Sequence, residues 1–185
     1  MTDQVSFEDI KELFRETDRK MQQTAEQMRE TDRELRTSFK ELNLQLGHLG
    51  NRLGEFVEGV VRPGLVRLFR ERGIEVHGTL RDVGGSRDGV ACQVDLLVVN
   101  DKDAVAVEVK SKLDQRDVDE HVERLGKFKL VFPVFASKRL LGAMGAMVIP
   151  DGAAAYAEKR GLFVIGQSGE DAVLLNSEGF VPGEW

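Results

Sequence analysis

The chain has 185 residues, 41% of them hydrophobic and 31% charged, enough for one ordinary domain and an appendage. Its net charge of −6 argues against a basic protein that coats nucleic acid, although bound cations can give an acidic enzyme a positive site. The single cysteine, Cys92, excludes an intramolecular disulfide framework, and no apolar stretch approaches a membrane span, so a cytoplasmic protein is expected.

A long N-terminal helix is the first predicted element, because residues 7 to about 53 contain no proline. The segment RETDRKM at positions 15–21 recurs as RETDREL at 29–35, an offset of two heptads. Apolar residues then follow at spacings of four and three: Leu35, Phe39, Leu42, Leu46, Leu49, Leu53, Phe56 and Val60. This spacing is typical of the seam of a left-handed coiled coil. Upstream, the same register runs through Met21, Ala25, Met28 and Asp32.

Residues 1–53 are therefore predicted to be a coiled-coil oligomerisation helix. A polar helix of this length has too little apolar surface to be stable alone, so a second copy of the chain is the expected partner. The alternative is a single exposed helix held by ion pairs between residues four apart.

Residues 54–185 are predicted to form an α/β domain, because apolar runs of strand length replace the heptads. A helix over 55–72, kinked or restarted at Pro63 and ended by Gly73, should come first. The other elements follow from periodicity and turn residues: strand 74–80, loop 81–89, strands 90–100 and 104–110, helix 114–128, strand 146–149, helix 152–160, and strands 162–166 and 172–175. This order predicts a mixed sheet flanked by helices on both faces.

Two of these strands carry the charged residues that indicate chemistry. Alternate side chains of a strand share a face, so Asp95 should point away from Val94 and Leu96. On the next strand, Glu108 and Lys110 should share one face in the same way. Hairpin pairing of the two strands is then expected to bring the two carboxylates and the ammonium group together.

Such a cluster is typical of a divalent metal site. Carboxylates in a strongly apolar strand are costly to bury unless they are paired or bind a cation. Mg²⁺ prefers carboxylate oxygens and keeps several waters, and a neighbouring lysine can help a metal-bound water attack phosphorus. The pattern predicts Asp95 and Glu108 as metal ligands and, with Lys110, as catalytic residues.

Asp95, twelve intervening residues and then Glu108-Val109-Lys110 resemble the PD-(D/E)XK motif of the restriction-endonuclease-like superfamily, with Val94 in place of its proline. Glu58 looks like the first-helix acidic residue of Holliday-junction-resolvase-type members, with Glu55 as the competitor. The whole chain also resembles bacterial and archaeal proteins that join an N-terminal coiled coil to such a domain. The resemblance implies a restriction-endonuclease-like core, Mg²⁺ or Mn²⁺ as cofactor with Glu58 as a further ligand, and metal-dependent hydrolysis of nucleic acid, with DNA as the expected partner.

Other polar residues carry weaker signals. Gln93 and Lys112 are candidate substrate-binding residues, and ordinary solvated side chains are the alternative. His48, His77 and His121 lack metal-ligand spacing, which argues against a zinc site. Two other functions stay open: a catalytically inactive nuclease-like domain that binds nucleic acid or protein, and a coiled-coil scaffold.

Overall fold

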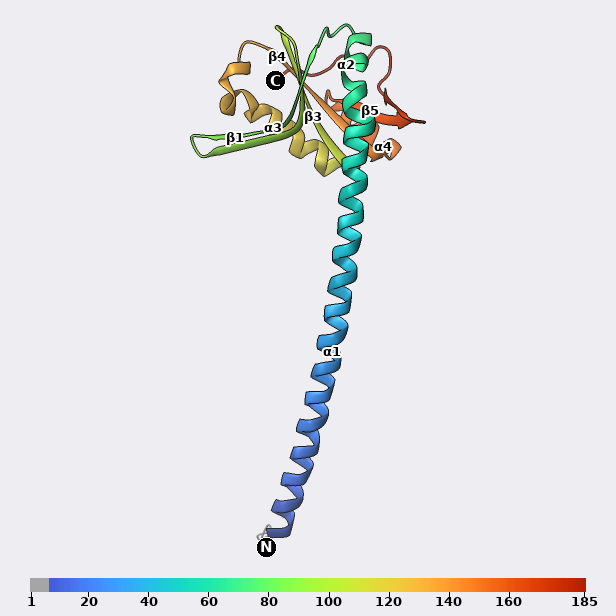
Figure 1. Ribbon diagram of the computed structural model, residues 1–185. Helices are drawn as coiled ribbons and strands as arrows, with labels where there is room; N and C mark the ends of the chain where they lie inside the picture. Colours follow the sequence, from blue (N-terminus) through green and yellow to red (C-terminus); the bar gives the residue numbers. More distant parts are fainter. Residues whose placement is uncertain (1–6) are drawn as a thin grey trace. The chain divides into compact units, whose positions relative to one another are not determined.

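The computed structural model describes residues 7–185, without the side chains of Asp9 and Glu58. Its contacts divide the chain into two units, Met1–His48 and Leu49–Trp185, whereas the sequence placed the division between Leu53 and Gly54. Figure 1 labels most of the helices and strands. Within residues 7–185, no helix combines the length and the apolar character that crossing a membrane requires.

Helix α1 spans Phe7–Phe56; its residues up to His48 belong to the first unit, and its last two turns belong to the second. Ion pairs between residues four apart stabilise its surface, with Glu16 2.8 Å from Lys20 and Asp32 2.9 Å from Arg36. Most of its large apolar side chains before His48 are nevertheless exposed, for example Phe7 at 72% and Leu42 at 50%. A helix with this surface presents an apolar stripe to whatever binds it.

The helix does not break at Gly54, where the sequence predicted the domain to begin. It continues to Phe56, widens into one π-helical turn over Val57–Val61 (η1) and resumes as α2, Arg62–Glu71. Pro63 lies in the first turn of α2, where a missing backbone N–H is tolerated, so the restart at proline is confirmed. Gly73 then ends the helical run with a φ of +74°.

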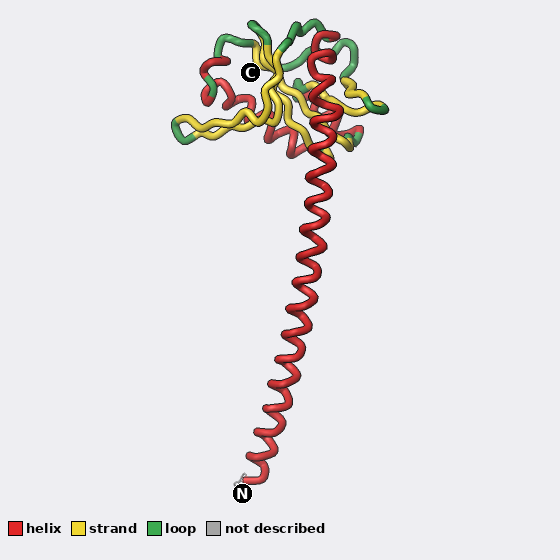
Figure 2. Tube along the Cα trace, in the orientation of Figure 1, coloured by secondary structure: helices red, strands yellow, loops and turns green. Residues whose placement is uncertain are grey.

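The second unit is built on one six-stranded sheet, shown in yellow in Figure 2. Its strands lie in chain order: β1 Gly78–Arg87, β2 Val90–Val99, β3 Asp103–Lys112, β4 Arg139–Val148, β5 Phe163–Ser168 and β6 Asp171–Leu174. The pairs β1–β2, β2–β3 and β5–β6 are antiparallel, and β3–β4 and β4–β5 are parallel. The predicted mixed sheet of an α/β protein is confirmed.

Two of the expected elements were wrong. Residues 81–87, predicted as a loop because of their glycines, continue β1, and the turn is limited to Asp88 and Gly89. Both turn residues have positive φ, 50° and 78°, which matches the right-handed twist of a hairpin. Strand β4 begins at Arg139 rather than Ala146; it is buried between two parallel neighbours, where an apolar run lacks the alternation that marks a strand.

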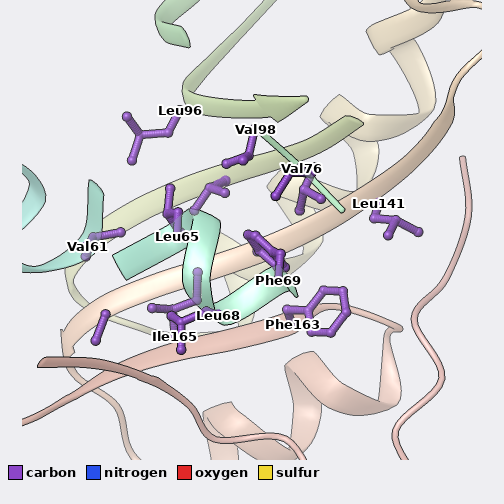
Figure 3. Packing of buried hydrophobic residues seen from close by; sticks show 14 of the residues in the cluster. Val61, Leu65, Leu68, Phe69, Val76, Leu96, Val98, Leu141, Phe163 and Ile165 are labelled. Carbon is purple, nitrogen blue, oxygen red and sulfur yellow. The ribbon is translucent and has the colours of Figure 1, made fainter. Parts of the chain in front are cut away.

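Helices cover both faces of the sheet. On one face α2 packs through Leu65, Leu68 and Phe69, and Figure 3 shows these residues in one cluster with Val98 and Phe163 of the sheet. On the other face lie α3, Gln115–Val131, and α4, Asp151–Lys159. Helix α3 starts with a reciprocal capping box, in which Asp114 and Asp117 each accept the other's backbone N–H. This fixed start sets the position of α3 above β2 and β3.

Candidate functional site

A fork between β2 and β3 forms the candidate site. The ladder between these strands runs from Val99 opposite Ala104 to Leu96 opposite Val107. From that point β2 stays paired with β1, while β3 stays paired with β4 as far as Lys112. The two strands therefore separate at Asp95.

The chain is distorted at the same point, and this corrects one prediction. Val94 and Leu96, expected on one face, pack into the clusters on opposite faces of the sheet. Across from Asp95, Asp82 of β1 has a φ of +47°, a left-handed conformation rare for a residue with a side chain. Asp82 and Asp95 are both skipped in the ladder between β1 and β2, and the alternation of β2 shifts by one residue there.

The Asp95 carboxylate lies in the gap between the strands. Its Oδ2 accepts a hydrogen bond of 2.7 Å from the backbone N–H of Val109. The carboxylate thus takes the place of the backbone carbonyl that a paired strand would offer this N–H. Burial raises the pKa of Asp95 above its usual range; the Val109 hydrogen bond opposes this, and the negative charge of Glu108 adds to it. Asp95 is thus a half-buried carboxylate whose charged form is disfavoured.

Glu108 is the most buried carboxylate of the fork, 5% exposed, and two cations contact it. Its Oε1 lies 2.9 Å from Nζ of Lys110, and its Oε2 accepts a 2.5 Å hydrogen bond from Nη1 of Arg124 on α3. Burial would lower the pKa of Lys110, but the hydrogen bond and charge of Glu108 outweigh it, so the pKa is raised and the ammonium stays charged at neutral pH. The predicted sharing of a face by Glu108 and Lys110 is confirmed.

A pocket of about 720 Å³ opens on the α3 side of the fork. Its lining combines both carboxylates, the guanidinium and small residues of the hairpin: Gly84, Gly85, Ala91, Cys92, Gln93, Asp95, Glu108 and Arg124. A second pocket of about 270 Å³ lies on the other side, between the fork and the end of α1, lined by Gly50, Leu53, Gly54, Val57, Arg81, Asp82, Asp95, Leu96 and Val109. Asp95 contributes to both, so the fork is accessible from both faces.

The other predicted site residues fall in different places. Gln93 lines the larger pocket, and its carbonyl accepts a long hydrogen bond of 3.5 Å from Arg124. Lys112 is exposed at the far end of β3 and does not line that pocket. The Glu58 side chain lies outside the described part of the structure; its backbone belongs to the π-helical turn. Glu55, the competitor, is exposed on α1.

Sequence reasoning missed Arg124. Its spacing holds a partial signal, since it lies one turn after His121 and next to Leu125, both of which are buried on the sheet side of α3. An arginine beside the buried face of a helix can reach a carboxylate on the sheet below it, but periodicity alone does not say which one.

The oxygen ligands of this fork suit a hard divalent cation. Carboxylates of Asp95 and Glu108 with several waters are a typical Mg²⁺ environment, and the adjoining pocket has room for those waters. Within the described residues, no group of three or more histidine, cysteine, aspartate or glutamate side chains is arranged to hold a metal ion.

One family model and two solved structures resemble parts of this chain. The model of a family described as protein of unknown function DUF3782 matches residues 14–86, a range that ends before Asp95 and Glu108. No curated protein matches the chain. Two solved structures are similar: the protein of unknown function AF1548, with 17% identity and a TM-score of 0.39, and a repair endonuclease from Pyrococcus abyssi, with 25% identity and a TM-score of 0.37. The matches cover 63% and 56% of this chain, and only 58% and 45% of those chains.

Proposed function

We propose that this protein hydrolyses phosphodiester bonds of nucleic acid, with DNA as the expected substrate, in a reaction that depends on Mg²⁺ or Mn²⁺. One observation carries the proposal: the carboxylates of Asp95 and Glu108 lie at one strand fork beside an open pocket, with the Lys110 ammonium 2.9 Å from Glu108. Their order in the sequence resembles the PD-(D/E)XK motif, and the mixed sheet between helices is compatible with a restriction-endonuclease-like core.

Each residue of the fork has a role in this reaction. Asp95 and Glu108 would hold the divalent ion, with the Val109 carbonyl as a further oxygen ligand. A bound ion would supply a more acidic water and neutralise charge on the phosphate. Lys110 would hydrogen-bond the attacking water, whose oxygen bonds to phosphorus as the bridging P–O bond breaks. One proton of that water would pass to solvent, and the leaving oxygen would take up a proton from solvent.

The proposal is tested by substituting Glu108, whose buried position makes it the strongest candidate ligand. Wild-type protein and Glu108→Gln are incubated with single-stranded, duplex and branched DNA, and with RNA, in Mg²⁺, Mn²⁺ or EDTA. We expect cleavage only with metal, reduced by about 100-fold or more in Glu108→Gln, as when a major electrostatic contribution to the transition state is lost.

The matched control is Glu120→Gln, which removes an exposed carboxylate of α3 that lies 3.8 Å from Arg116. This variant should cut like the wild type. Equal cutting by wild type and Glu108→Gln would refute the proposal. Binding of nucleic acid without cutting, in both proteins, would instead support the inactive interaction module, which the acidic net charge of −6 does not exclude.

We also propose that a second copy of the chain binds the apolar stripe of α1. Its residues recur every seventh position and are between 50% and 72% exposed: Phe7, Phe14, Met21, Met28, Leu35 and Leu42. Two hollows lie along this face, lined by Thr17, Lys20, Met21, Thr24, Ala25 and Met28, and by Thr24, Gln27, Met28, Thr31, Asp32 and Leu35. Burying each of the six apolar side chains is worth roughly 1.5–3 kcal/mol, which together is comparable with the roughly 4–15 kcal/mol cost of association.

Two leucines on the same helix provide a matched test. Leu42 belongs to the stripe, whereas Leu44, 59% exposed, lies off it. We expect light scattering of the full chain to give a multiple of 20.6 kDa, which Leu42→Lys reduces and Leu44→Lys leaves unchanged. A monomeric wild type, or the same effect from both variants, would contradict self-association through this face.

A further inference from the structure

The contact between Arg124 and Glu108 bears on how a metal ion could bind Glu108. Both oxygens of Glu108 are engaged, one by Lys110 of the same strand and one by Arg124 of a different element. A buried carboxylate needs such compensation, because an unpaired charge at this depth is very costly. A divalent ion that binds Glu108 brings the same compensation, so it competes with a cation already present.

The two cations are not equally replaceable. Lys110 lies two residues from Glu108 on β3, and its Nζ is also 3.9 Å from Asp117 at the start of α3. The guanidinium of Arg124, in contrast, makes only one other hydrogen bond among the described residues, to the carbonyl of Gln93 at 3.5 Å. Glu108 is thus the main group that holds the guanidinium, and a metal ion bound at Oε2 of Glu108 would take that contact from Arg124.

The helix below Arg124 is held in place, which confines the exchange to a side chain. One turn earlier, His121 is fully buried, with Nε2 3.2 Å from the carbonyl oxygen of Ala106 on β3. One residue later, Leu125 packs in the core cluster of this face. The Arg124 side chain itself is 24% exposed and lines the 720 Å³ pocket, so it can change rotamer without moving α3.

The direction of that movement follows from the pocket. A guanidinium that leaves Oε2 of Glu108 remains beside Asp95 and Gln93, at the position where a substrate phosphate would approach the carboxylates. Guanidinium groups bind phosphate oxygens through two parallel hydrogen bonds, in the same way that they bind carboxylates. A phosphate therefore offers Arg124 a replacement for the contact that it loses.

We propose that Arg124 is a positioning residue that exchanges partners: it neutralises Glu108 while no metal is bound, and it moves to a phosphate of the nucleic acid when a divalent ion takes Glu108. This inference rests on the proposed function, because it takes the Glu108 site as the metal site. The exchange makes metal binding and nucleic-acid binding favour each other, because the metal ion releases the Arg124 guanidinium from Glu108 and the phosphate then binds it.

The test measures Mn²⁺ affinity by titration calorimetry, with and without a single-stranded oligonucleotide whose cleavable linkages are phosphorothioates. Wild type, Arg124→Gln, Arg124→Lys and the exposed control Lys127→Gln are compared, and circular dichroism shows whether each is folded. We expect Arg124→Gln to bind Mn²⁺ about tenfold more tightly than wild type without oligonucleotide, equivalent to about 1.4 kcal/mol. We also expect the oligonucleotide to tighten Mn²⁺ binding to wild type and Lys127→Gln, but not to Arg124→Gln.

Arg124→Lys keeps the charge with a different reach, so its Mn²⁺ affinity should lie between those of wild type and Arg124→Gln. Unchanged or weaker Mn²⁺ binding in both folded Arg124 variants would overturn the exchange. Glu108→Gln separates the proposed metal site from the proposed exchange. If Glu108→Gln binds Mn²⁺ like wild type, the metal site is wrong. If Glu108→Gln loses Mn²⁺ binding and the Arg124 variants behave like wild type, only the exchange is wrong.

Discussion

Acid should destabilise this domain through one buried histidine, His121. Its side chain is fully buried, and burial lowers its pKa to about 4 from an ordinary 6.5. The negative charge of Glu108 and the Ala106 carbonyl oppose this shift, while Arg124 and Lys110 reinforce it. If Nε2 donates to the Ala106 carbonyl, a second proton falls on Nδ1, which has no hydrogen-bond partner among the described residues.

The sign and size of the effect follow from linkage. Because the folded-state pKa is lower than that of the unfolded chain, the unfolded state binds more protons between pH 6.5 and 4, and stability falls as the pH falls through that window. The free energy of unfolding should lose about 2 kcal/mol by pH 5 and about 3 kcal/mol by pH 4 from this group alone. Below pH 4 the His121 contribution should level off.

Urea titrations of wild type and His121→Gln at pH 7.5, 6, 5 and 4 isolate this contribution, because all other titrating groups are shared. We expect the free energy of unfolding of wild type, relative to that of His121→Gln, to fall by about 3 kcal/mol from pH 7.5 to pH 4. His77→Gln is the control, since it makes the same substitution at an exposed histidine. A constant difference between wild type and His121→Gln at all four pH values would refute the reasoning.

Two further predictions concern the fork and the sheet. Burial raises the pKa of Asp95, so its negative charge weakens the metal-free fold at neutral pH. Asp95→Asn should therefore raise the melting temperature and abolish Mn²⁺ binding. A lower melting temperature would show that the hydrogen bond from Val109 outweighs the cost of burial. In the core, a Cβ on Gly142 would collide with Leu125 and Leu162, so Gly142→Ala should cost about 1–3 kcal/mol in urea unfolding. The same change at Gly126, where nothing lies within 4 Å of an added Cβ, should be neutral or stabilising, and equal effects at both positions would count against the packing argument.

The sequence predicted best where one physical rule acts alone. The α1 helix and strands β2 and β3 were predicted because heptad spacing and alternation are local properties. The stretch 81–87 was misjudged because its glycines signal a loop, whereas hydrogen bonds to β2 impose a strand. Alternation also placed Glu108 and Lys110 together, but it gave the wrong faces for Val94 and Leu96, because the distortion at Asp95 depends on where two strands part. Arg124 was missed because its contact with Glu108 depends on how α3 lies over the sheet.

The fork also explains why several unusual groups occur together. Separation of β2 from β3 leaves the Val109 N–H without a strand partner, and the Asp95 carboxylate satisfies it. The same separation opens the pocket and leaves Glu108 buried at its edge, where only Lys110 and Arg124 make its charge tolerable. A fold selected for stability alone would be better served by an apolar residue at position 108, since well-packed hydrophobic residues often match or exceed a buried ion pair. A buried carboxylate at such a cost, beside an aspartate and a lysine whose pKa values are both raised, is what a catalytic or ligand-binding site requires.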